Sequence, residues 1–150
     1  MKKFADGFAL LTVSAWVGGL WAIGYVAVPV LFQTLPDRMQ AGLLAGKMFT
    51  LIAYIGLSSA SYLLAHQLNE FGKTAHKQLV FRVVAAMLLL TLISQFGLQP
   101  IMADLKAQAL PDEVMHSAFA DRFKILHGVS SILYLAQSLL GAWLILKIKR

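Results

Sequence analysis

Residues 7–36 decide the fold, and they read GFALLTVSAWVGGLWAIGYVAVPVLFQTLP. These thirty residues carry no formal charge, and Asp6 and Asp37 flank them on either side. An uncharged apolar run of about eighteen residues or more predicts a helix that crosses a membrane. A secretory signal has a shorter apolar core of about 7–15 residues, and no convincing small-x-small cleavage site follows this stretch. We therefore expect an uncleaved first transmembrane helix.

The composition of the whole chain points to the same class of protein. Of the 150 residues, 59% are hydrophobic and 13% are charged, whereas a soluble domain carries about a quarter charged residues. The net charge of +6 comes from basic clusters beside apolar runs, a pattern that sets membrane topology rather than nucleic-acid binding. Cysteine is absent, which excludes disulfides and thiolate metal sites. The lipid bilayer is the expected partner, and no nucleic acid is.

Four uncharged apolar stretches predict a single all-α domain, an integral membrane four-helix bundle that occupies residues 1–150. The expected helices are 7–36, 48–69, 83–103 and 125–146. The last three are close to the ~20 residues that cross a hydrocarbon core of ~30 Å. The first would be ~45 Å long, so we expect its outer end to project from the hydrocarbon or to kink at Pro29.

The distribution of lysine and arginine predicts the orientation. The N-terminus, the 70–82 loop and the C-terminus share one side and hold eight such residues, against five on the other side. The positive-inside rule then places both termini in the cytoplasm. The short basic N-terminus, without targeting features, makes a bacterial inner membrane the expected location.

The two outer loops share a Leu-Pro-Asp sequence, at 35–37 and at 110–112. Each aspartate can cap a short helix with apolar residues on one face. These residues are Met39, Leu43 and Leu44 in the first loop, and Met115, Phe119 and Phe123 in the second. We therefore expect short amphipathic segments in both outer loops, lying on the bilayer surface. The repetition also suggests a duplicated two-helix hairpin.

Small residues four apart predict where helices pack closely in lipid. In the first two helices the residues expected at these contacts are Gly18, Gly19, Ala22, Gly56 and Ala60. Trp16, Trp21 and Tyr25 stand among the ladders of the first helix. Aromatic residues at helical spacing usually fill the bundle or face lipid, and this interpretation is favoured over a wall for a flat apolar ligand.

Polar residues at membrane depth are costly and are therefore the best functional candidates. His127 is the sharpest of them, with Gln33 and Gln99 expected in the same outer leaflet. One interpretation is a histidine hydrogen-bonded to a neighbouring helix, for example to either glutamine. The functional interpretations are a proton relay, a haem ligand or a metal ligand.

Methionines and histidines gather towards the expected outer face, which suggests a soft metal site for Cu(I). The candidate ligands are Met39, Met48, Met102, Met115 and His116, together with His127. Methionine is also a common apolar filler, and no Met-x-Met or His-x-x-x-His spacing supports the metal. No phosphate-binding loop, nucleophile elbow or zinc-protease motif is present, so no catalytic residue is expected.

Two segments resemble a known bacterial family. They are Trp16 to Trp21 continuing to Pro29, and Gly42 to Phe49, which are similar to the family called domain of unknown function 4149, or transmembrane-protein-205-like. The segment Arg122 to Ser131 looks like its second landmark. The resemblance implies a small four-helix membrane protein and brings no established activity with it.

Three functions stay open at this point. The first is a non-enzymatic structural or accessory role in a membrane complex, with a homo-oligomer or another membrane protein as partner. The second is haem, copper or quinone binding with His127 as ligand. The third is a small oligomeric transporter or channel lined by the glutamines Gln33, Gln95, Gln99 and Gln137.

Overall fold

Four long helical rods make up the protein. The computed structural model describes residues 2–147, with side chains from Phe4 onward, and its regular structure is entirely helical. The rods Phe4–Thr34, Arg38–Lys77, Leu79–Ala109 and Ala120–Lys147 are each long and apolar enough to cross a membrane. The prediction of an all-helical chain with four helices able to cross a membrane is therefore confirmed. Lys149 and Arg150, counted above for the orientation, lie outside the described residues.

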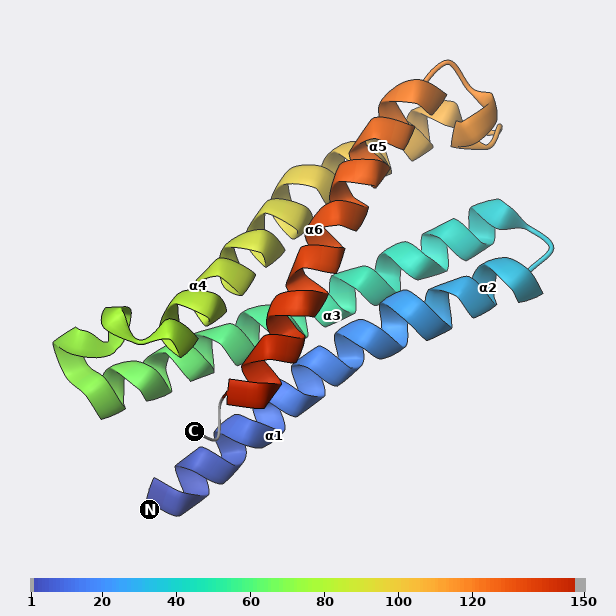
Figure 1. Ribbon diagram of the computed structural model, residues 1–150. Coiled ribbons are helices and arrows are strands. Elements are labelled where there is room, and N and C mark those ends of the chain that lie inside the picture. The colour runs from blue at the N-terminus through green and yellow to red at the C-terminus, as the bar shows by residue number, and fades with distance from the viewer. Residues whose placement is uncertain (1, 148–150) are drawn as a thin grey trace.

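Each rod is built from one or more helical segments (Figure 1). The first rod joins α1 (Lys2–Trp21), the π-helix η1 (Ala22–Ala27) and α2 (Val28–Thr34), and the second joins α3 (Arg38–Phe71) to the 3-10 helix η2 (Gly72–Lys77). The third joins α4 (Leu79–Leu92), the π-helix η3 (Ile93–Leu98) and α5 (Gln99–Ala109). The 3-10 turn η4 (Val114–His116) precedes the fourth rod, α6 (Ala120–Lys147).

The rods are arranged as neighbours in a ring. α1 packs on α3, α3 on α4, α4 on α6, and α6 on α1. The start of α1, the end of α6 and the connection around η2 lie at one end of the bundle, and the other two connections lie at the opposite end (Figure 1). We call these the terminal end and the loop end.

Both rods that carry an internal proline contain a π-helical segment just before it. Pro29 is the second residue of α2, after η1, and Pro100 is the second residue of α5, after η3. Proline lacks the amide hydrogen for the preceding turn, and its ring needs room there, which the wider π turn provides. At Pro29, where the sequence predicts a projecting end or a kink, the structure has this π-helical segment. The same arrangement in the first and third rods agrees with a duplicated hairpin.

The first outer loop contains the predicted cap but not a separate segment. Asp37 Oδ1 accepts hydrogen bonds from the backbone amides of Met39, at 2.8 Å, and Gln40, at 3.3 Å. The helix that starts there continues without a break to Phe71. Because no proline interrupts it, the expected amphipathic segment forms the first turns of the long helix α3.

The second outer loop differs from the prediction. Asp112 caps no helix, residues 114–116 form a 3-10 turn, and α6 begins only at Ala120. Val114 is buried against Leu105 and Ala109 of α5. Burial of this apolar side chain stabilises the compact turn in place of the expected helix.

Trp16 is the largest side chain that is fully buried in the core. It lies against Gly56 of α3, where a Cβ atom would come within 2.5 Å of Trp16 Nε1. The next residue, Val17, packs in the same way against Gly141 of α6. A Cβ atom on Gly141 would lie 2.9 Å from Val17 Cγ2. Adjacent residues of α1 therefore fix its contacts with both neighbouring helices.

Replacement of Gly56 by leucine should destabilise the bundle, since the added side chain overlaps the Trp16 indole. The expected loss is on the order of 1–3 kcal/mol, as for overpacked cores. Gly46→Leu on the same helix is the matched control, because a Cβ there meets no atom within 4 Å. Thermal unfolding in detergent measures both variants, and an equal effect on the two would contradict the Trp16 packing.

Candidate functional site

His127 lies on the exposed surface of α6 rather than in a polar cluster. Its ring stacks on Phe123, with centroids 5.9 Å apart and planes 11° from parallel. Within residues 2–147, no hydrogen bond joins His127 to Gln33 or Gln99. Gln33 is exposed in α2, and Gln99 is half-buried at the start of α5. The structure therefore does not assemble these three residues through hydrogen bonds.

The residues suggested for a soft metal differ widely in exposure. Met102 is buried, Met115 is exposed, and Met39 and Met48 are half-buried in α3. The exposed imidazole of His116 faces Glu113, with Nδ1 and Oε2 3.5 Å apart. Copper binding by this set stays a prediction.

The aromatic residues of the first rod do not form one wall. Trp16 is fully buried, whereas Trp21 and Tyr25 are 44% and 51% exposed. The Tyr25 hydroxyl donates to Ser138 Oγ of α6 at 3.0 Å. Trp16 therefore serves the core, while Trp21 and Tyr25 lie on the outer surface.

The small residues of the first rod differ in what surrounds them. Gly19 faces Ile52 of α3, because a Cβ atom on Gly19 would lie 2.6 Å from Ile52 Cδ1. On α3, Gly56 and Ala60 are buried, as expected for packing residues. A separate row is exposed, and we call it the α1 ladder: Ser14 and Gly18 of α1, and Ala22, the first residue of η1. Contrary to the packing expected for Gly18 and Ala22, a Cβ on Gly18 would have no neighbour within 4 Å. The Trp16 contact turns this side of α1 away from the bundle.

Several polar side chains inside the bundle form hydrogen bonds between helices, whereas Trp16 Nε1 and the side-chain oxygen of Gln67 are buried without a partner among the described residues. Gln137 of α6 donates from Nε2 to Thr91 Oγ1 of α4 at 2.7 Å, and that hydroxyl donates to the Met87 carbonyl at 2.9 Å. The Tyr134 hydroxyl donates to the Leu20 carbonyl at 2.6 Å. Such bonds across helices satisfy groups that water cannot reach in a membrane.

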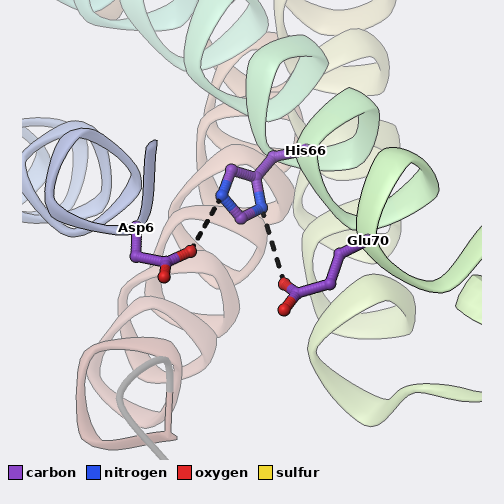
Figure 2. Close-up of side chains that lie close together, drawn as sticks. All are labelled: Asp6, His66 and Glu70. Carbon is purple, nitrogen blue, oxygen red and sulfur yellow. Dashed lines mark ion pairs between the residues drawn. The ribbon is translucent and has the colours of Figure 1, made fainter. Parts of the chain in front are cut away.

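A histidine and two carboxylates meet at the terminal end of the bundle. His66 of α3 lies between Asp6 of α1 and Glu70 of α3, as Figure 2 shows. His66 Nε2 is 3.3 Å from Asp6 Oδ1, and its Nδ1 is 4.0 Å from Glu70 Oε2. The histidine side chain is 15% exposed, and the carboxylates are 60% and 37% exposed. We call these three residues the terminal triad.

Two hollows adjoin the terminal triad. A small cavity of about 80 Å³ is lined by the triad together with Gln67 and apolar residues. A wider groove of about 460 Å³ adjoins the triad on the side of Tyr62 and Asn69. The side-chain oxygen of Gln67 is buried and has no hydrogen-bond partner among the described residues. The terminal triad is thus accessible from both hollows, and it lies near the unpaired side-chain oxygen of Gln67.

The sequence alone does not indicate this triad. Asp6 flanks the first apolar run, and His66 lies within the predicted helix 48–69. The spacing of His66 and Glu70, four apart on one helix, puts them on the same face. That spacing was a usable signal, but nothing in the sequence pairs it with Asp6, sixty residues earlier.

Comparison with known proteins identifies the family. The family model described as "Domain of unknown function (DUF4149)" matches residues 11–111, which is about two thirds of the chain, so the chain belongs to this family. The match includes the α1 ladder, His66 and Glu70, whereas Asp6 and α6 lie outside it. No curated protein and no solved structure matches the chain.

Replacement of Thr91 by valine should destabilise the bundle, because the buried Gln137 amide loses its acceptor. Interhelical hydrogen bonds in membranes average about 0.6 kcal/mol, with a maximum of about 1.7, so a loss of that order is expected. In a double-mutant cycle with Gln137→Leu, the second substitution should cost less once the first is present. Thermal unfolding measures the cycle, and strictly additive effects would contradict the pairing.

Proposed function

We propose that this member of the DUF4149 family is a non-enzymatic accessory protein of a membrane complex, and that the α1 ladder contacts a transmembrane helix of the partner. The observation that supports the proposal is the outward position of Ser14, Gly18 and Ala22. These residues are four apart and lie within a membrane-crossing rod.

The physics of helix association in lipid explains why this position favours a partner. Lipid tails are as apolar as leucine side chains, so helices associate through close backbone contact, which small residues permit. The ladder contributes no such contact inside the bundle, because Val13, Trp16, Val17 and Leu20 already fill the buried side of α1. A second helix could approach the α1 backbone closely at Gly18, where no side chain intervenes.

The alternative functions have less support. Haem, copper or quinone binding at His127 is not favoured by its exposed position beside Phe123, and the absorption spectrum and metal content of the purified protein test it. A transporter pathway is not favoured by Gln137, whose amide is buried in a bond to Thr91. The partner on the α1 ladder is either a second copy of this chain or a different membrane protein.

The proposed setting is a bacterial inner membrane with both termini in the cytoplasm. The support is the excess of lysine and arginine on the side of the termini and of the 70–82 loop, eight residues against five. The terminal triad is then on the cytoplasmic side, at the level where a membrane-crossing helix meets water.

Gly18→Leu should remove the complex and leave the fold intact. The leucine side chain blocks close approach of a partner helix, while the open space around Gly18 accommodates it within the monomer. Gly97→Leu, at another exposed glycine with no neighbour within 4 Å, is the matched control. Size-exclusion chromatography in mild detergent compares the assemblies, and thermal unfolding verifies the folds.

The absence of cysteine in the wild-type chain allows a sharper version of this experiment. In native membranes, the Ser14→Cys variant carrying a thiol-attached photo-cross-linker should give one cross-linked species, whose mass separates a homodimer from a complex with another protein. A wild-type chain that runs as a monomer, together with no cross-link from the Ser14→Cys variant, would contradict the proposal.

The orientation is testable with the same cysteine-free background. In intact cells, a membrane-impermeant maleimide should label a cysteine at Asp112, in the loop end, and should not label one at Thr74, in η2. Both positions are exposed, so permeabilised cells should give labelling at both. The reverse pattern in intact cells would place the termini outside.

A further inference from the structure

We propose that the terminal triad, Asp6, His66 and Glu70, binds a divalent transition-metal ion of the Zn²⁺ class. This site lies at the terminal end of the bundle and is independent of the accessory role proposed for the α1 ladder. One imidazole and two carboxylates form a mixed nitrogen and oxygen ligand set that zinc accepts in proteins.

The geometry brings all three ligands within reach of one ion. One ligand atom from each residue lies within 4.8 Å of the other two. Two atoms that bind the same zinc ion, each at about 2.0–2.2 Å, lie no more than about 4.4 Å apart. Asp6 faces Nε2 of His66 and Glu70 faces Nδ1, so binding through one ring nitrogen requires at least one carboxylate side chain to rotate towards it. His66 and Glu70 follow the i, i+4 spacing that presents two ligands on one helical face.

The charges of the triad favour a cation. Two carboxylates face a single imidazole, and among the side chains described from Phe4 to Lys147 their ion-pair partner is His66 alone. Two carboxylates close together repel each other, and a cation bound to both would offset that repulsion. The two positive charges of a divalent ion would balance the negative charges of the two carboxylates.

Gln67 supplies an independent indication of a missing ligand. Its buried side-chain oxygen has no partner, although it lines the same 80 Å³ cavity as the triad. A buried acceptor without a donor costs on the order of 1–3 kcal/mol. Water bound to a metal ion in this cavity would provide a donor. Three protein ligands also leave a position open for such water.

Metal binding should act on the bundle as a clamp. Asp6 belongs to α1, whereas His66 and Glu70 belong to α3, so one ion would join the two helices at the terminal end. An ion that binds only the folded state raises the stability of that state. This consequence gives a measurement that does not depend on any activity.

The test uses the untagged, metal-depleted full chain in detergent. Co²⁺ serves as a spectroscopic probe for Zn²⁺, and competition with a chromophoric chelator gives the affinity for Zn²⁺. We expect one saturable equivalent, with affinity at least about tenfold lower in His66→Ala, because loss of even an outer-shell partner costs that much. Asp6→Asn and Glu70→Gln should also weaken binding. His76→Ala is the control, since His76 is an exposed histidine at the same end.

Thermal unfolding with and without Zn²⁺ separates a metal site from a simple ion pair. The metal should raise the unfolding temperature of the wild type and of His76→Ala, and should raise that of the near-isosteric Asp6→Asn and Glu70→Gln variants less. If Zn²⁺ leaves the wild type unchanged, or if all variants bind it alike, the proposal is overturned and the triad is an ion pair only.

Discussion

The contact between Trp16 and Gly56 is the constraint on which the rest of the structure depends. A fully buried indole fits against a helix that has no side chain at that point. In lipid this steric fit matters more than apolar character, since every exposed surface is already solvated by hydrocarbon. With Val17 seated beside Gly141, two adjacent residues hold α1 against both α3 and α6.

This constraint fixes the rotation of α1 about its own axis, and that rotation determines which residues stay outside. At about 100° per residue, Ser14 and Gly18 each lie about 160° around the helix from Trp16. They consequently face away from the bundle. Asp6 lies about 80° from Trp16, at the edge of the buried side, where it meets His66 of α3. The outward position of the α1 ladder and the position of Asp6 beside His66 therefore both follow from the contact between Trp16 and Gly56.

The number of helices was predictable from the sequence because membrane-crossing helices are read from apolar length alone. The ends of the helices were not predictable. α3 runs from Arg38 to Phe71, and the polar residues near its two ends lie outside the apolar stretch that hydropathy marks. The side that Gly18 faces was not predictable either. Gly18 and Gly19 are adjacent and have the same helix propensity. Only the packing of Trp16 decides which of the two faces α3. The terminal triad depends on a contact between residues sixty positions apart, which one sequence does not encode as a visible pattern.

The rotation of α1 is tested most directly by spin labels placed one at a time at residues 11–22 of the cysteine-free chain. The protein is reconstituted as a monomer in bilayers, and collision with molecular oxygen reports exposure to lipid. We predict low accessibility at Val13, Val17 and Leu20, and high accessibility at Ser14 and Gly18. Low accessibility at Ser14 and Gly18, with high values at Val13 and Val17, would contradict this prediction.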